Sequence, residues 1–321
     1  MNTPATRRFL VEHQSSFHYA EPARGSMVLL RLQPQENPDQ RLLKYSLSIE
    51  PDAATNVFED AFGNTCHLFN IHREHARLTV LSRSLVETSV KPPPEKHVDA
   101  DNWNTLAETV DRVRYWEYLN PSRFVYMSSS LQAFMDEKDI RPGASALSAL
   151  LETASKLHAA FRYMPGSTKV DSPIEHILET GEGVCQDYTH VLLAIARSWG
   201  IPSRYVSGYL HLLGATGDQA PAGVSHSWGE FWLPESGWVG IDPTNNSLAN
   251  DRHVRVAVGR DYADAAPTRG TYFSGGNSTL EVTVTVAESD ETVPKATSQA
   301  ERTNFLNISP VARTLQTRPD Q

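Results

Sequence analysis

Hydrophobic and polar residues alternate in short stretches along the N-terminal part of the chain, from Phe9 to about Val90. These stretches are enriched in β-branched and aromatic residues, and Pro, Gly and Asn separate them at a spacing typical of strands joined by turns. The pattern predicts a β-rich N-terminal domain over residues 1–90. The sequence KPPPEKH that follows interrupts the alternation, because successive prolines remove backbone donors and favour an extended chain. We therefore expect a Pro-rich linker over residues 91–101.

Beyond the linker the hydrophobic period lengthens to that of an α-helix, about 3.6 residues. Residues 105–118 and 129–137 show this period, and the segment SALSALLETASKLHAAFRYMP shows it most clearly. Another helix is expected from Cys185 to Trp199, because Gly200 ends its apolar face and a proline follows. The apolar positions that share one face in SALSALLETASKLHAAFRYMP are Leu147, Leu150, Leu151, Ala154, Leu157 and Phe161.

Strand-like stretches return from Ser203, so helices and strands are mixed in the region 102–291. We expect a second domain there, and the protein as a whole is then of the α+β class. The remaining residues, 292–321, are polar, and their end, QTRPDQ, has the composition of a disordered tail. A chain of 321 residues is long enough for two such domains.

Composition and charge narrow the kinds of partner. The chain is 40% hydrophobic and 21% charged, which is ordinary for a globular protein. A net charge of −9 and a pI near 5.7 argue against a nucleic-acid surface, where clustered Lys and Arg are needed. The sequence has no apolar run typical of a signal peptide or a membrane span, and its two cysteines are too far apart to suggest a disulfide framework. We therefore expect a cytoplasmic protein that binds neither nucleic acid nor membrane.

One of the two cysteines, Cys185, occupies the first turn of a predicted helix, directly after GEGV. The partial positive charge of a helix N-terminus favours the thiolate, which is the nucleophilic form of cysteine. Gly181 and Gly183 have no side chains, so a substrate carbonyl could approach the sulfur and the amide at the helix start. A single cysteine on an apolar helix is nevertheless more often a small buried side chain, so catalysis by Cys185 would require partners.

Partners for a thiol occur in SHSWGEFWLPESGWVGIDPTNN, where two aromatic-rich stretches flank a Pro-Glu-Ser-Gly turn and predict a β-hairpin. His226 and Asp242 lie equally far from Pro234 in sequence, so a hairpin centred on that proline sets them opposite each other on one face. Asp242 would then orient the imidazole of His226, and His226 would pair with Cys185 as its base. Each residue alone is more often structural, and only the combination of all three indicates catalysis.

Other kinds of site have weaker support in the sequence. Zinc bound by Cys185, His190 and His226 is the obvious metal alternative, but the paired ligand spacings of structural zinc sites, such as C-x2-C, are absent. EF-hand, Walker, GxGxxG and GxSxG patterns are absent as well. We therefore predict no metal and no cofactor.

Several segments together resemble the bacterial transglutaminase-like proteins, whose core belongs to the papain-like cysteine enzyme superfamily. The core segments are GVCQDYTH, GIPSRYVSGYL, SHSWGEFWLPESGWVGIDPTNN and HVRVAVGRDYADAAP. The resemblance extends to FRYMPGSTKVDSP and, in the N-terminal domain, to FHYAEPARGSMVLLRLQP and DAFGN, and it covers roughly residues 8–287. It implies a transglutaminase-like catalytic core over residues 102–291, in which a helix carrying the cysteine packs on an antiparallel sheet carrying the histidine and the aspartate.

The resemblance implies a role for each residue of the site. Cys185 is the nucleophile, His226 the general base and acid, and Asp242 the carboxylate that orients His226. Ser227 stands where many relatives have Ala, and this exchange of small residues should leave the site intact. The Cys185 amide is the first expected oxyanion donor, and a second donor near Tyr163 stays open.

Other residues near these motifs have both a structural and a functional interpretation. Asp187 either stabilises the helix N-terminus or contacts substrate, and the first is favoured. His190 falls off the helix face of Cys185 and is expected to be structural. Arg260 and Asp261 in GRDYAD are expected to brace a loop, and a role at the edge of the cleft stays open. Three aromatic residues of the hairpin could line an acyl groove, although core packing is their more common role: Trp228, Trp232 and Trp238.

These residues predict an enzyme that transfers an acyl group through a thioester on a peptide or isopeptide amide of a peptide or protein substrate. Hydrolysis by a transglutaminase-like cysteine peptidase or amidase is the favoured reaction. A transglutaminase that uses an amine acceptor is the first alternative, and a catalytically idle binding module is the second. The polar segment 211–224 could form a mobile wall beside His226. The sequence does not predict the oligomeric state.

Overall fold

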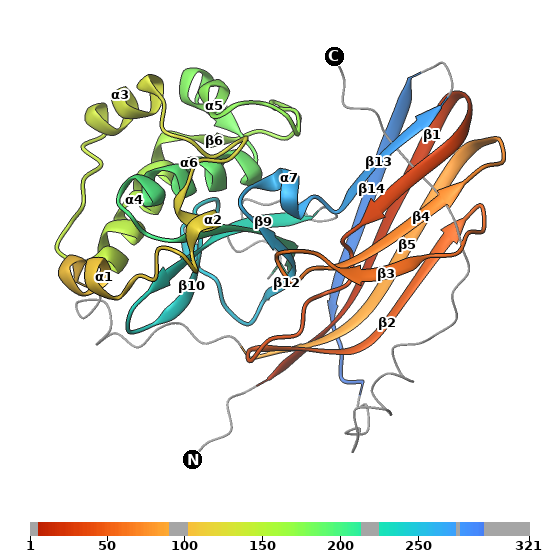
Figure 1. Ribbon diagram of the computed structural model, residues 1–321, viewed down its shortest axis with the longest axis horizontal. Helices are drawn as coiled ribbons and strands as arrows, with labels where there is room; N and C mark the ends of the chain where they lie inside the picture. The colour runs from red at the N-terminus through yellow and green to blue at the C-terminus, as the bar shows by residue number, and fades with distance from the viewer. Residues whose placement is uncertain (1–5, 90–101, 213–224, 274–276, 292–321) are drawn as a thin grey trace.

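The structure, a computed structural model, describes residues 6–89, 102–212, 225–273 and 277–291 (Figure 1). Figure 1 shows a β-rich half beside a mixed half that contains the described helices. The architecture is therefore α+β, as the sequence predicts. The expected linker at 91–101, the expected disordered end at 292–321 and nearly all of the expected mobile wall lie outside the described residues.

The N-terminal strands form one antiparallel sheet in the spatial order β2-β5-β1-β4-β3, which confirms the β-rich N-terminal region. β1 pairs with β5 along Arg7–His18 and with β4 along Ser26–Leu30, and its register shifts between these two stretches. Alternate residues such as Phe17 and Val28 enter the core, which explains the period of two in the sequence. The strands are β1 (Arg7–Leu30), β2 (Gln40–Glu50), β3 (Asn56–Glu59), β4 (Thr65–Ile71) and β5 (His75–Thr88).

Two C-terminal strands also belong to this sheet. β13 (Thr268–Phe273) pairs with the second half of β1, and β14 (Ser278–Glu288) pairs with its first half. The structure differs here from the sequence prediction, which places all residues up to 291 in the second domain. Alternating valines identify β14 as a strand but carry no information about its partner, and in the structure Val284 packs in a cluster with Phe9 of β1.

A second antiparallel sheet lies in the mixed half, in the order β11-β10-β9-β8-β12. The central helix α6 (Cys185–Ser198) packs on β9, and α4 (Ala146–Ala160) packs against α6. Nearly all of α6 is buried, so this helix forms the centre of the domain. The strands are β8 (Ser203–Leu210), β9 (His226–Leu233), β10 (Gly237–Asp242), β11 (Ser247–Leu248) and β12 (His253–Gly259).

The other helices agree in part with those expected from the periodicity of the sequence. α3 (Ser129–Glu137) matches its prediction, and Ser128 caps it by accepting a hydrogen bond from the amide of Leu131, the third residue of the helix. The single helix predicted over 105–118 is wrong: the Asp111 carboxylate accepts two backbone amides and forms a turn between two shorter helices. The remaining elements are α1 (Trp103–Thr109), α2 (Trp116–Leu119), α5 (Ile174–Thr180), α7 (Tyr262–Ala265), β6 (Arg162–Tyr163) and β7 (Glu182–Gly183).

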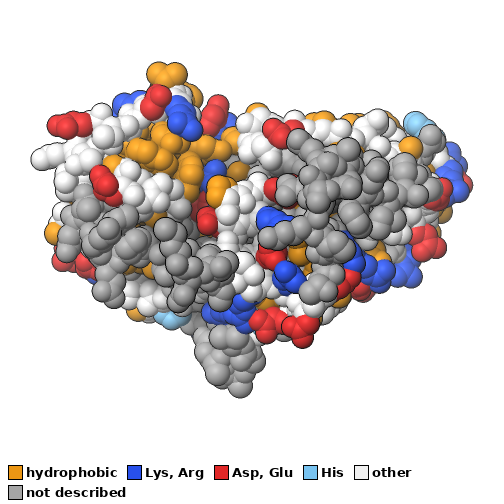
Figure 2. Space-filling model, turned by 90° about the horizontal axis from the view of Figure 1, so that it is seen from below, with side chains coloured by type: hydrophobic (Ala, Val, Ile, Leu, Met, Phe, Trp, Pro, Cys, Tyr) orange, Lys and Arg blue, Asp and Glu red, His pale blue; other side chains and the backbone are white. Residues whose placement is uncertain are grey.

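The two halves share a hydrophobic cluster. Phe9 and Val11 of β1 pack there with Tyr209 of β8 and Val254 of β12. On the face shown in Figure 2, acidic and basic side chains are interspersed, and hydrophobic side chains gather over part of the mixed half. Among the helices that the structure describes, none has the length and apolar character needed to cross a membrane.

Candidate active site

Cys185 is the first residue of α6, and Val184 precedes the helix in an extended conformation. The first amides of a helix have no intrahelical acceptor, and those of Cys185 and Gln186 have no acceptor elsewhere among the described residues. The Cys185 side chain is partly exposed, whereas most of α6 is buried. A reachable thiol and unpaired amide donors therefore occur together at the start of α6, as an oxyanion hole requires.

Asp187 stabilises this helix start. Its carboxylate accepts a hydrogen bond from the Val184 amide at 2.8 Å and another from the Thr168 hydroxyl at 2.7 Å. Burial raises the pKa of Asp187, although both hydrogen bonds act in the opposite direction. These contacts support the structural interpretation of Asp187, because they tie the helix start to the preceding backbone and to a neighbouring loop.

The structure explains why glycine occupies two positions before Cys185, Gly181 by its backbone conformation and Gly183 by close packing. Gly181 ends α5 with a φ of 70°, a left-handed conformation that side chains disfavour. A Cβ atom at Gly183 would lie 2.5 Å from Cδ1 of Ile177 and 3.0 Å from Cβ of Asp187. Gly183 therefore allows α5 and α6 to approach each other, whereas the sequence suggested a space for substrate.

His226 and Asp242 meet across the β9–β10 hairpin, where Nε2 of His226 lies 2.7 Å from Oδ2 of Asp242. The sequence predicts that the two residues lie directly opposite each other, but they do not. Gly237 pairs with Leu233, so the observed register differs from the predicted one by two residues. A shift of two residues leaves every side chain on its predicted face, since side chains alternate with a period of two. The pair therefore forms along a diagonal of the hairpin.

The third predicted residue, Cys185, acts electrostatically on the same imidazole. Burial alone would lower the pKa of His226, but the Asp242 carboxylate and then the Cys185 thiol raise it well above its usual value. The other ring nitrogen, Nδ1, is buried and has no partner of good hydrogen-bond geometry among the described residues. The thiol thus influences the ring without a hydrogen bond of good geometry to Nδ1, which is common in sites without substrate.

Asp242 is held as an anion by several donors. Oδ1 accepts from the amides of Thr244 and Asn245 at 3.0 and 3.2 Å, and Oδ2 accepts from the Asn245 side chain at 2.8 Å. Burial alone would raise the pKa of Asp242, but His226 and then His253 lower it below its usual range. A permanently charged carboxylate favours a protonated His226 and thereby a thiolate at Cys185.

The other candidate residues have structural positions. Trp228 is 2% exposed and packs with Val206 and Val258, which agrees with core packing rather than a groove. Trp232 and Trp238 both pack against Tyr115. His190, the third ligand of the zinc alternative, instead accepts the Tyr262 amide at 3.2 Å and stacks on Phe124.

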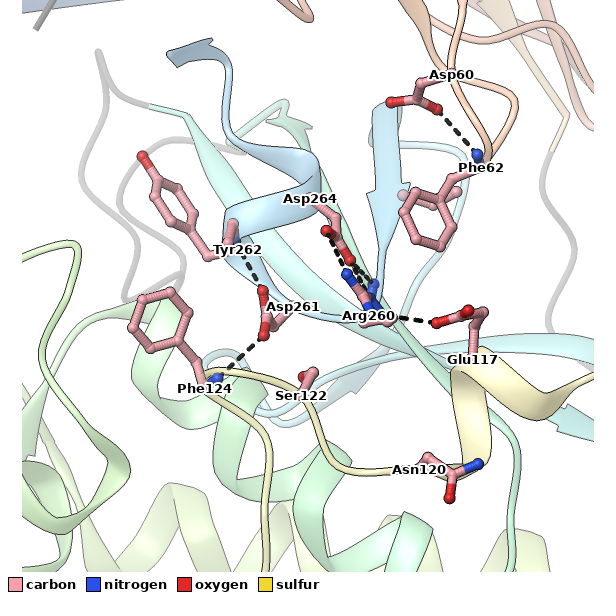
Figure 3. Close-up of polar contacts among 12 residues, drawn as sticks. Asp60, Phe62, Glu117, Asn120, Ser122, Phe124, Arg260, Asp261, Tyr262 and Asp264 are labelled. Atoms are coloured by element: carbon pink, nitrogen blue, oxygen red, sulfur yellow. Dashed lines mark hydrogen bonds and ion pairs between the residues drawn. The ribbon is translucent and has the colours of Figure 1, made fainter. Parts of the chain in front are cut away.

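Figure 3 shows the expected loop brace around Arg260 and Asp261. Asp261 accepts the amide of Phe124 at 3.0 Å and that of Ala263 at 2.8 Å, so it joins the start of α7 to the segment before α3. Arg260 lies between Asp264, at 2.8 Å, and Glu117, at 3.3 Å. The structural interpretation of both residues is thus confirmed by their contacts.

Tyr163 and Ser227, which the sequence also singles out, both lie in strands. Tyr163 of β6 pairs with Gly183 of β7 in the parallel β6–β7 pair. Burial raises the pKa of Tyr163, and the charges of Cys185 and other neighbours raise it further. Ser227 is 2% exposed in β9, so its small side chain fits the packed interior as the sequence suggested.

Sequence reasoning missed His253 and Asn245, both of which donate to Asp242. The sequence contains a signal for Asn245, because it lies three residues after Asp242 in the Asp-Pro-Thr turn. It contains none for His253, which lies in another strand. Potential metal ligands of His226, Asp242 and His253 lie within 4.8 Å of one another. The 2.7 Å separation between His226 and Asp242 suits a hydrogen bond, because ligands around one zinc ion would be about 3.3 Å apart.

The chain is similar in sequence to known proteins. The family model "Bacterial transglutaminase-like N-terminal region" matches residues 9–87, and "Transglutaminase-like superfamily" matches residues 137–243. An uncharacterized protein of Mycobacterium leprae is 33% identical over 282 residues, which cover 87% of this chain and 98% of that protein. A protein-glutamine gamma-glutamyltransferase of Pseudomonas aeruginosa is 32% identical over 106 residues, or 30% of this chain and 15% of that protein.

A solved structure from Cytophaga hutchinsonii, described as a candidate cysteine protease, superposes with a TM-score of 0.70. The match covers 90% of this chain and 93% of that chain at 21% sequence identity. It therefore shows a common fold that includes both halves of the molecule.

Proposed function

The chain belongs to the family of bacterial transglutaminase-like proteins, and from that premise we propose that it transfers an acyl group through a thioester on Cys185. One observation carries the proposal: Nε2 of His226 lies 2.7 Å from the Asp242 carboxylate, and the Cys185 thiol raises the pKa of the same imidazole. A nucleophile, a base and an orienting carboxylate are the groups that acyl transfer requires. A buried structural cysteine would need neither partner.

The proposed reaction uses these groups in two steps. The Cys185 sulfur attacks the carbonyl carbon of an amide, and the proton held by His226 passes to the nitrogen as the carbon–nitrogen bond breaks. The amine leaves and a thioester remains. His226 then takes a proton from an incoming water or amine, whose attack breaks the carbon–sulfur bond and restores the thiolate. The amide of Cys185, which has no acceptor within the described ranges, stabilises the oxyanion in both steps.

Hydrolysis of a peptide or isopeptide amide is the reaction that we propose first. The Cys185 side chain is partly exposed, so water can reach a thioester formed on it. Transamidation is the second candidate, and it is favoured by the 106-residue similarity to the Pseudomonas aeruginosa protein-glutamine gamma-glutamyltransferase. Both reactions share the thioester and differ only in the nucleophile that resolves it.

Mass spectrometry of a peptide library incubated with the protein tests the proposal, with and without a small primary amine. Cys185→Ala removes the nucleophile, and Cys66→Ala is the matched control because Cys66 is the other, buried cysteine. Cleaved or deamidated peptides that require Cys185 alone would support hydrolysis, and amine adducts on glutamine would support transamidation. Products that persist in Cys185→Ala would overturn the proposal, and the absence of any products would favour an idle binding module.

We propose the cytoplasm as the location of this enzyme, because Cys66 and Cys185 are both free thiols and a reducing compartment maintains them. Cell fractionation followed by detection of the protein would test this. Recovery in an extracytoplasmic fraction would overturn it without affecting the proposed chemistry.

A further inference from the structure

The carboxylate of Asp242 is shared by two imidazoles. Nε2 of His226 lies 2.7 Å from Oδ2 of Asp242, and Nε2 of His253 lies 3.4 Å from the same oxygen. His226 begins β9 and His253 begins β12, two strands that are separated by β8 in the sheet. The side chain of His253 is almost completely buried, so water is not a ready alternative partner for its ring.

The hydrogen bonds of His253 fix its tautomer. The backbone amide of Asn250 lies 3.2 Å from Nδ1 of His253. Because a backbone amide only donates, Nδ1 must accept, and the proton of the neutral ring is on Nε2. Nε2 therefore donates toward Asp242. The amide of Asn250, in the turn before β12, thus selects the tautomer in which His253 donates to Asp242.

Trp228 fixes the position of the His253 ring. The two rings pack edge to face, with centroids 5.0 Å apart and planes at 78°. Glycines on the neighbouring strands make room for the indole: a Cβ at Gly208 would lie 2.7 Å from the Trp228 ring, and a Cβ at Gly240 would lie 3.4 Å from its nitrogen. The large side chain therefore packs closely between these strands and leaves His253 little freedom to turn.

We propose that His253 is a positioning residue, which holds the carboxylate of Asp242 in the orientation that His226 needs. This inference rests on the proposed function. The longer bond from His253 restrains Oδ2 while the shorter bond to His226 is kept, and the amides of Thr244 and Asn245 restrain Oδ1. The carboxylate cannot then rotate away from His226 while protons move during the reaction.

Two substitutions separate the two hydrogen bonds of His253. His253→Gln keeps a donor near the position of Nε2, so it can still reach Asp242. His253→Asn keeps an acceptor near the position of Nδ1 for the Asn250 amide, but it is too short to reach Asp242. His67→Leu controls for the loss of a buried histidine, because His67 lies in β4 of the N-terminal sheet.

The readout is the rate at which iodoacetamide alkylates Cys185, followed by peptide mass spectrometry across the neutral pH range with a chelator present. This rate reports the activation of the thiol and does not require a known substrate. The charged or titratable groups that face the two imidazoles are Asp242, Cys185 and Arg252. Thermal unfolding of each variant verifies that it is folded.

We expect His253→Asn to slow alkylation by about 10- to 100-fold and to move its pH profile toward that of an ordinary thiol. His253→Gln and His67→Leu should stay within about threefold of the wild type. Equal rates in the wild type and both His253 variants would overturn the inference, and so would equal slowing by Gln and Asn. A wild-type Cys185 that reacts no faster than free cysteine would instead overturn the proposed function and this inference with it.

Discussion

The side chain of Asn64 forms two hydrogen bonds with the backbone of Val258: Nδ2 donates to the carbonyl oxygen at 2.7 Å, and Oδ1 accepts from the amide at 2.8 Å. Asn64 precedes β4 and Val258 lies in β12, so a side chain of the N-terminal domain replaces a neighbouring strand at the edge of the second sheet. Phe62 from the same loop packs against the cluster of Val206, Trp228 and Val258 and lies near Arg260 in Figure 3. The N-terminal domain thus contacts the strand that begins with His253.

Substitution of Asn64 tests this contact. We expect Asn64→Ala to lower the free energy of unfolding by about 1–3 kcal/mol, because the amide and carbonyl of Val258 lose their partner while buried. Asn64→Asp should cost at least as much, since a carboxylate oxygen would then face the carbonyl oxygen. Denaturant unfolding measures both, with Asn56→Ala in the exposed strand β3 as the control. Equal losses at Asn56 and Asn64 would contradict the role of the Val258 contact.

The two cysteines should react at very different rates. Burial raises the pKa of the Cys66 thiol to about 11, so little thiolate forms there near neutral pH. We expect iodoacetamide to modify Cys185 rapidly and Cys66 only after unfolding, and peptide mass spectrometry can follow both thiols in one sample. Cys66→Ala should leave the rate at Cys185 unchanged. Similar rates at both thiols would mean that Cys185 is not activated.

Asp242→Asn should nearly abolish activity. Both carboxylate oxygens of Asp242 now accept N–H groups, but the side-chain amide of asparagine has only one oxygen that can accept, and its NH2 group can only donate. His226 would also lose the negative charge that favours its protonated form. We expect Cys185-dependent turnover of the peptide library to fall by about 10³- to 10⁴-fold. Asp264→Asn, which breaks the pair with Arg260, is the control and should retain activity. Retained turnover in Asp242→Asn would remove Asp242 from the mechanism.

The sequence predicts the members of the candidate site better than their exact arrangement. Cys185, His226 and Asp242 follow from a helix start and a hairpin, which are local patterns. The predicted register of the hairpin differs from the observed one by two residues, yet the period of two keeps both side chains on one face. His253 and Asn64 were missed because their partners lie in other strands, and periodicity carries no information about such contacts.

Gly183→Ala should disturb the start of α6 through steric conflict. The added Cβ would lie 2.5 Å from Cδ1 of Ile177, so α5 would have to move away from α6. We expect a loss of about 1–3 kcal/mol in the free energy of unfolding and slower alkylation of Cys185. Ile177→Val in the same chain should restore part of both. Gly143→Ala, where the nearest atom is 3.8 Å away, is the tolerated control, and equal effects at the two glycines would refute the packing argument.

Acid should weaken the loop that carries Asn64, because Asp60 organises it. The Asp60 carboxylate accepts the amides of Phe62 and Asn64 at 3.0 and 3.1 Å and Nε of Arg31 at 2.9 Å. Burial alone would raise the pKa of Asp60, but these contacts lower it below its ordinary value. The folded chain then binds fewer protons than the unfolded chain, so this stabilisation is present above about pH 4 and is lost as the pH falls through the folded pKa.

Denaturant unfolding at a series of acidic pH values measures this dependence. The free energy of unfolding should fall with decreasing pH in the wild type, and Asp60→Asn should flatten part of the fall while lowering the stability at neutral pH. Asp39→Asn removes an exposed carboxyl group of the same domain and should preserve the slope. If Asp60→Asn keeps the full slope, other carboxyl groups control the acid response. The link between Asp60, the Asn64 loop and β12 would then contribute to stability at neutral pH alone.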